Sequence, residues 1–129
     1  MNTITSTTFT ATATVGLYKS YSKELISINT FKKALCKAQE EIKKEFNVAL
    51  STKMTLCQII FLGQEEPSVS LDFIQYPKFP KDEVVLQEAI MQLVQLLMES
   101  LDQNRIVIVF QNETICLEKS EEIDPKIQL

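Results

Sequence analysis

The sequence predicts an α+β fold of the ferredoxin-like type, a split βαβ sandwich with both helices on one face of an antiparallel sheet. Apolar residues alternate with polar ones in several short stretches, which is typical of strands with one buried face. Two longer stretches carry apolar residues at three- and four-residue steps, which is typical of helices. The stretches follow one another as strand, helix, strand, strand, helix, strand, with a short extra C-terminal strand. A different α+β arrangement of the same elements, with the second helix central, is the alternative.

The first half of the chain predicts a strand, a helix and a second strand. Residues 8–18 alternate apolar side chains with threonines, which predicts a strand with one wetter face. The helix is expected to begin at Ser27 or Asn29, both good N-cap residues, and to end near Phe46. Its apolar residues form one narrow stripe, so the helix has one buried side and one wet side. The second strand is expected over residues 53–62 and is apolar on both faces toward its end.

The second half begins with a predicted hairpin. Pro67 is expected to interrupt the strand ladder because proline has no N–H to donate, so the third strand is expected over residues 69–76. The short Gly/Pro loop between the second and third strands indicates antiparallel pairing. After the second helix, residues 105–110 are expected to form a central strand, since both of its faces are apolar. Residues 114–118 form a short returning strand.

The second helix, expected over residues 82–101, is too apolar for an ordinary surface helix. Its polar residues fall in one narrow sector, whereas a helix lying on a sheet needs an apolar stripe of only about 100°. The surplus must be covered by the first helix, by a second copy of the chain or by a different partner. Large exposed apolar patches usually mark interfaces, and twofold dimers are the commonest oligomers. A homodimer contact is therefore expected on the shoulders of this helix, at Val85, Val94, Leu96 and Met98.

Length and composition bound the class of protein. With 129 residues, the chain is expected to form one domain over residues 1–118, followed by a charged, frayed tail over residues 119–129. The net charge of −4 and the single arginine, Arg105, disfavour nucleic-acid binding. No apolar run is long enough to span a membrane, and the N-terminus does not resemble a secretory signal. Three widely spaced cysteines fit a reducing compartment, so a cytoplasmic location is expected.

The chain contains no histidine, which removes the commonest general base and the commonest metal ligand. The cysteine spacing matches no metal motif, so neither a metal nor a cofactor is expected. Cys36 lies within a helical turn of several lysines, a setting that favours reactive thiols. An incidental surface thiol is the simpler interpretation, and the reactivity of Cys36 is left open.

Any acid–base chemistry must come from the residue types that remain. The candidate catalytic residues are Tyr18, Lys19, Asp72 and Tyr76. The polar loop after the first strand offers an ammonium group and hydroxyl donors that could hold an anion, through Tyr21, Ser22 and Lys23. A solvated loop is the simpler interpretation of that segment. The adjacent carboxylates Glu65 and Glu66 are interpreted as ordinary solvated charges.

These observations favour a non-catalytic cytoplasmic interaction or small-ligand-binding module that forms a homodimer through its second helix. One alternative is a small enzyme that works without histidine, using a pocket of tyrosine, aspartate and lysine. Another is an accessory subunit whose second helix is covered by an unknown protein partner. No segment carries the residues that an RNA-recognition module, an acylphosphatase or an amino-terminal-proline tautomerase would need.

Overall fold

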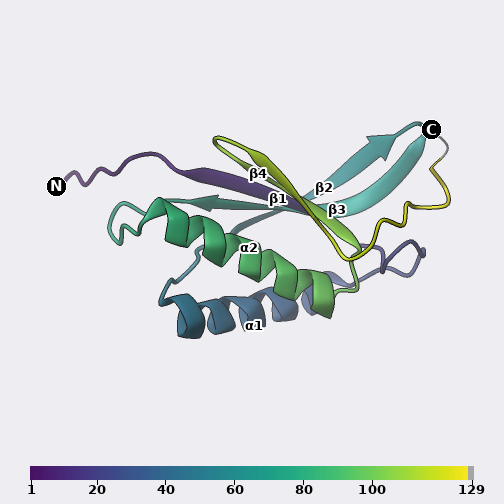
Figure 1. The fold of residues 1–129 in the computed structure, drawn as a ribbon, viewed down its shortest axis with the longest axis horizontal. Coiled ribbons are helices and arrows are strands. Elements are labelled where there is room, and N and C mark those ends of the chain that lie inside the picture. The colour runs from purple at the N-terminus through teal and green to yellow at the C-terminus, as the bar shows by residue number, and fades with distance from the viewer. Residues whose placement is uncertain (128–129) are drawn as a thin grey trace.

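The computed structural model describes residues 1–127 and confirms the predicted ferredoxin-like α+β class. Five antiparallel strands form one sheet in the order β2-β3-β1-β4-β5, and both helices cover the same face of it (Figure 1). The additional strand β5 extends the β4 edge, as the sequence predicts. The elements are β1 (Thr10–Gly16), α1 (Ile28–Phe46), β2 (Lys53–Phe61), β3 (Gln64–Ile74), α2 (Glu83–Ser100), β4 (Arg105–Phe110) and β5 (Thr114–Glu118).

Helix α1 begins where its capping residue predicts. The Ser27 hydroxyl accepts a hydrogen bond from the Thr30 backbone N–H at 3.1 Å, which satisfies one of the free donors of the first turn. The helix ends at Asn47, whose left-handed conformation lets its N–H donate to the Lys43 carbonyl. Only one stripe of α1 is buried, as the sequence predicts.

Helix α2 is covered by the chain itself. Asp82 caps its first turn by accepting from the Val84 N–H at 2.9 Å. The helix packs against the sheet on one side and against α1 on another, so its wide apolar arc lies in the core. Val94 and Met98 are only 0% and 4% exposed, and Val85 and Leu96 are half-buried against the same core. The expectation that a second copy covers these residues is therefore corrected, because α1 and the sheet already do so.

The β2–β3 hairpin is longer and tighter than the sequence predicts. Its ladder continues through Pro67, which pairs with Gln58, and closes in a two-residue turn at Leu62 and Gly63, both with positive φ. Proline has no N–H to donate to the Leu17 carbonyl on the neighbouring strand. Pro67 is tolerated because that carbonyl accepts a hydrogen bond from the Ile26 N–H at 2.7 Å instead. The expected interruption of the strand at Pro67 is therefore wrong.

The exposed apolar surface of the molecule lies on this hairpin. Its tip extends past the ends of both helices (Figure 1), so no helix covers the distal half of β2. Large apolar side chains with more than two-fifths of their surface exposed follow one another there. They are Leu56, Ile59, Ile60, Phe61 and Leu62.

Within residues 1–127, neither helix is long and apolar enough to cross a membrane.

Candidate functional site

A carboxylate on β3 is pressed against a glycine on β1. Glu66 lies two residues before Ser68, which pairs with Gly16 across the β1–β3 ladder. Side chains two apart in a strand share a face, so Glu66 and Gly16 both lie on the sheet face away from the helices. The Glu66 Oε1 atom occupies the space that a Cβ at Gly16 would need. A side chain at this position would displace the Glu66 carboxyl group, which lies at the end of a flexible side chain.

A buried amide borders the same space. Gln103 follows α2 and is only 6% exposed. Its Nε2 donates to the Tyr18 carbonyl at 2.7 Å and to the Leu101 carbonyl at 3.2 Å, which fixes the orientation of the amide. Its Oε1 would lie 3.3 Å from a Cβ at Gly16, so it is directed toward the space that Glu66 occupies. An acid and an amide oxygen therefore meet above one glycine.

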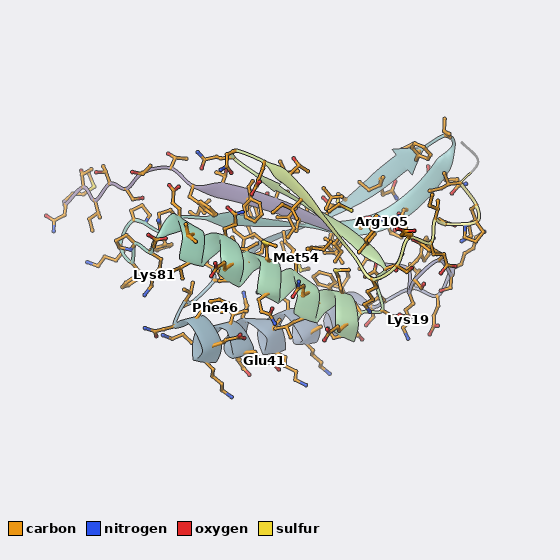
Figure 2. All side chains as sticks on the ribbon, in the orientation of Figure 1. Lys19, Glu41, Phe46, Met54, Lys81 and Arg105 are labelled. Atoms are coloured by element: carbon orange, nitrogen blue, oxygen red, sulfur yellow. The ribbon has the colours of Figure 1, made fainter. Side chains whose placement is uncertain are left out.

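A network of polar side chains continues from this point to the start of β4. Asn104 donates from Nδ2 to the Tyr21 hydroxyl at 2.9 Å, and that hydroxyl donates to the Glu122 carbonyl at 2.8 Å. Arg105 donates from Nε to Glu118 Oε2 at 2.8 Å and from Nη2 to the same Glu122 carbonyl at 3.2 Å. Its hydrogen bond to Glu118 raises the pKa of Arg105, so the guanidinium stays charged. Figure 2 shows Arg105 and Lys19 at this end of the molecule.

The segment after β5 runs along the border of the site. Residues 119–127 form no helix or strand, yet the Lys119 N–H donates to the Asn104 carbonyl at 2.9 Å, and Gln64 Nε2 donates to the Lys126 carbonyl at 2.8 Å. The frayed tail that the sequence predicts is therefore held along residues 119–127; residues 128 and 129 lie outside the described part of the chain. This segment brings Asp124 and Lys126 within electrostatic reach of Glu66.

The pKa of the Glu66 carboxyl is raised above its ordinary value. Partial burial is the largest cause, because it disfavours the ionised form. The negative charge of Asp124 raises the pKa further, and the positive charge of Lys126 opposes both effects. Glu66 as a residue is exposed to solvent, although its carboxyl group is partly buried, so a ligand can reach it. A carboxyl group with a perturbed pKa, packed onto a glycine and close to Asp124 and Lys126, is a candidate functional site.

The structure does not bring the four predicted catalytic residues together. Lys19 forms an exposed ion pair with Glu24 at 3.1 Å, close in sequence to Tyr18. Asp72 accepts from the Thr12 hydroxyl at 2.7 Å and lies six residues from Glu66, roughly 20 Å along β3. Tyr76 lies beyond the end of that strand, so these residues do not converge on one site.

Of the predicted anion-binding loop, the structure brings Tyr21 to the site. The Ser22 hydroxyl donates to the Lys19 carbonyl at 2.6 Å and accepts from the Glu24 N–H at 3.1 Å, so it builds the turn. Lys23 is exposed in the same turn. The three cysteines are free thiols, and Cys36 lies exposed on α1. No group of three or more Cys, Asp or Glu residues within residues 1–127 is arranged to hold a metal ion.

Sequence reasoning missed Glu66, Gly16 and Gln103. Glu66 was indistinguishable from its neighbour Glu65 as a surface charge, because its partners lie far away in the chain. One local signal exists. A glycine within a strand often marks a place where another group approaches closely, and Gly16 ends an alternating threonine-rich strand.

The sequence matches no known protein-family model and no curated protein. Among solved structures, the fold is similar to that of a phage SAM lyase in its apo state, with a TM-score of 0.69 and 17% sequence identity, over 89% of this chain and 91% of that chain. It is also similar to a phage SAM lyase in complex with S-methyl-5′-thioadenosine, with a TM-score of 0.61 and 15% identity, over 95% of this chain and 98% of that chain. At these identities the likeness establishes the fold.

These likenesses overturn the expectation of a non-catalytic interaction module. Both solved structures are of an enzyme, and one of them holds a nucleoside thioether. The expectation rested on the missing histidine and on the apolar second helix. The apolar second helix is explained by packing within one chain. The fold is thus similar to that of a phage SAM lyase.

Proposed function

We propose that this protein is an enzyme that cleaves S-adenosylmethionine without water and releases S-methyl-5′-thioadenosine, at the site around Glu66. The similarity to phage SAM lyase over nearly the whole chain supports the reaction class. The observation that carries the location is the Glu66 carboxyl, which is packed onto Gly16 with a raised pKa. Acidic groups with perturbed pKa values are concentrated at functional sites, which supports this location.

The reaction suits a chain without histidine. S-Adenosylmethionine carries a positively charged sulfonium, and breaking the bond between sulfur and the methionine side chain sends the electron pair to sulfur, which leaves a neutral thioether. The carbon that loses sulfur is then closed by the substrate's own carboxylate to give a lactone, or its neighbour loses a proton to give an alkene. The lactone route needs no further group, whereas the alkene route needs a base to accept the proton, and the Glu66 carboxylate is the candidate for that role. The protein has to bind, orient and exclude water, which is a positioning task.

Glu66 is suited to attract the sulfonium. A carboxylate in a partly desolvated site interacts more strongly with a cation than one in bulk water. The bound cation in turn favours the ionised form of Glu66, so substrate affinity should rise as the pH rises through the raised pKa of this group.

We also propose that the enzyme is a cytoplasmic homo-oligomer that uses the β2–β3 hairpin as its contact. Ile59 is the cross-strand partner of Glu66, and Ile59 and Phe61 share its face of the sheet, so part of the exposed apolar surface of the hairpin lies beside the proposed site. Apolar surface of this extent in one place usually marks an interface. A second copy seated there would remove water from the Glu66 carboxyl.

The test is product analysis with purified protein and S-adenosylmethionine, followed by NMR and mass spectrometry. The wild type should release S-methyl-5′-thioadenosine together with a lactone or an alkene, and Glu66→Gln should lose activity by roughly 100-fold or more, the scale of a lost electrostatic group. Glu65→Gln is the matched control, because this adjacent carboxylate lies on the opposite face of β3. Absence of the thioadenosine product from the wild type, or equal activity of both variants, would disprove the proposal.

A further inference from the structure

A second cavity, of about 430 Å³, lies at the opposite end of the molecule from Glu66. It is enclosed by the end of α1, by residues 47–51 and by the connection from β3 to α2. Figure 2 shows Lys81 and Phe46 at this end, with Arg105 and Lys19 at the other. Ile74, on its wall, is eight residues from Glu66, roughly 27 Å along β3. Its volume is within the range of small-molecule sites.

The wall of this cavity presents a pair of aromatic rings. Tyr76 and Phe79 stack with ring centroids 5.8 Å apart and planes inclined by 20°. They are 52% and 66% exposed, which is unusual for two large rings on one short connection. The lining of the cavity also includes the buried apolar side chains Val48 and Leu86. The lining therefore offers both aromatic and aliphatic surface to a flat ring.

The connection that carries the rings is held in place by hydrogen bonds within the chain. Gln75 is only 9% exposed, and its amide forms two hydrogen bonds with the backbone of Lys81. Its Nε2 donates to the Lys81 carbonyl at 2.6 Å, and its Oε1 accepts from the Lys81 N–H at 3.0 Å. The Phe79 N–H donates to the Tyr76 carbonyl at 3.0 Å. A preformed wall lowers the entropic cost of binding.

The charge at this cavity is positive in a chain of net charge −4. Lys43 and Lys81 line it, and no acidic side chain does. The Lys43 ammonium donates to the neutral Asn47 Oδ1 at 2.7 Å. Neither lysine belongs to an ion pair within residues 1–127, where the ion pairs are Lys19–Glu24 and Arg105–Glu118. Two ammonium groups without carboxylate partners favour an anionic ligand.

We propose that this cavity binds a small, flat, aromatic anion, with its ring against Tyr76 and Phe79 and its negative group near Lys43 and Lys81. The inference is independent of the proposed lyase activity, because it uses none of the residues around Glu66. It assigns the predicted candidate Tyr76 to ligand stacking, away from the reaction.

The test compares naphthalene-2-sulfonate with the neutral naphthalene-2-sulfonamide by calorimetry and by ¹⁵N NMR titration of the full chain. The sulfonate should bind roughly tenfold more tightly than the sulfonamide, with amide shifts at residues 48–51 and 74–81. Lys43→Gln and Lys81→Gln should each weaken the sulfonate about fivefold and leave the sulfonamide unchanged. Lys44→Gln, on the same helix but outside this cavity, is the matched control.

Phe79→Ala should weaken both probes and leave the fold intact, because this ring is 66% exposed. Equal affinity for the two probes, or equal effects of Lys44→Gln and Lys81→Gln, would overturn the proposal. Shifts confined to the β2–β3 hairpin would also overturn it. If S-methyl-5′-thioadenosine displaced the sulfonate, the two compounds would share one site, and the proposal of a separate ligand for this cavity would be refuted.

Discussion

Helix α2 and the β2–β3 hairpin both carry many large apolar side chains, and the structure covers those of the helix and leaves many of those of the hairpin exposed. The helix lies between the sheet and α1, with seven residues buried. The hairpin extends beyond both helices and exposes a run of large apolar side chains. The difference teaches that apolar content alone does not locate a free surface. What decides is whether a second layer reaches the element, and here the helices are too short to reach the hairpin tip.

The largest expected effect is the difference in unfolding free energy between a substitution in α2 and one at the hairpin tip. Leu93→Ala in α2 should lower the free energy of unfolding by about 3 kcal/mol, because the side chain is fully buried and its loss leaves a cavity. Leu62→Ala at the hairpin tip should change it by less than about 0.5 kcal/mol, because that side chain is 76% exposed. Urea denaturation of both variants measures the contrast. Similar destabilisation by the two substitutions would mean that the hairpin tip is packed in solution.

The next effect concerns assembly. The double substitution Ile60→Lys and Leu62→Lys should weaken self-association by at least tenfold, since two ammonium groups cannot be desolvated in an apolar contact. Light scattering and sedimentation measure the mass. Val84→Lys is the control, because Val84 is 64% exposed on α2 and should not alter the mass. A wild-type protein that sediments as one chain at micromolar concentration would contradict the oligomer proposal.

A smaller effect probes the contact beneath the proposed site. Gly16→Ala places a methyl group where the Glu66 carboxyl lies, and the flexible glutamate side chain can move aside. Lyase activity should fall about tenfold, whereas stability should change by less than about 0.5 kcal/mol. Kinetics with S-adenosylmethionine and thermal unfolding give the two numbers. Thr14→Ala, on the same face of β1, is the control, and an equal loss of activity there would rule out a special role for Gly16.

The smallest effect is the dependence of stability on pH. The raised pKa of Glu66 means that folding favours its protonated form, so its contribution to stability is fully present below the ordinary pKa of a glutamate. That contribution is lost as the pH rises through the raised folded-state pKa. Glu66→Gln should therefore be more stable than the wild type at pH 7, by a few tenths of a kcal/mol given the partial exposure, and equal to it near pH 4.

Thermal unfolding at the two pH values measures this difference. Glu65→Gln controls for the general loss of one negative charge. If Glu66→Gln is less stable than the wild type at pH 7, the ionised carboxylate is stabilised in the fold and the desolvation argument for this site is wrong.

The order and type of the elements could be predicted because both depend on local periodicity. The threonine-rich alternation of β1, the narrow stripe of α1 and the Asp82 cap of α2 are visible in the sequence and agree with the structure. The interruption at Pro67 could not be judged locally. Whether a proline breaks a ladder depends on whether the carbonyl opposite it has another hydrogen-bond donor. Here the Leu17 carbonyl accepts from the Ile26 N–H, which lies outside the ladder.

The candidate site was harder to predict, because no local sequence pattern distinguishes its residues from ordinary surface residues. Glu65 and Glu66 are adjacent and chemically identical, yet only Glu66 meets Gly16 and the segment around Asp124. Tyr21 was selected for its hydroxyl and does join the site network, whereas Asp72 was selected for its carboxylate and lies elsewhere on the sheet.

The sequence by itself determined the strands, the helices, their caps and the absence of histidine, because each is a property of neighbouring residues or of composition. Only the tertiary structure decided which apolar element is covered and which carboxyl is desolvated. Both depend on the packing of segments distant along the chain, since burial is set by what lies above a side chain in space and local periodicity carries no information about it.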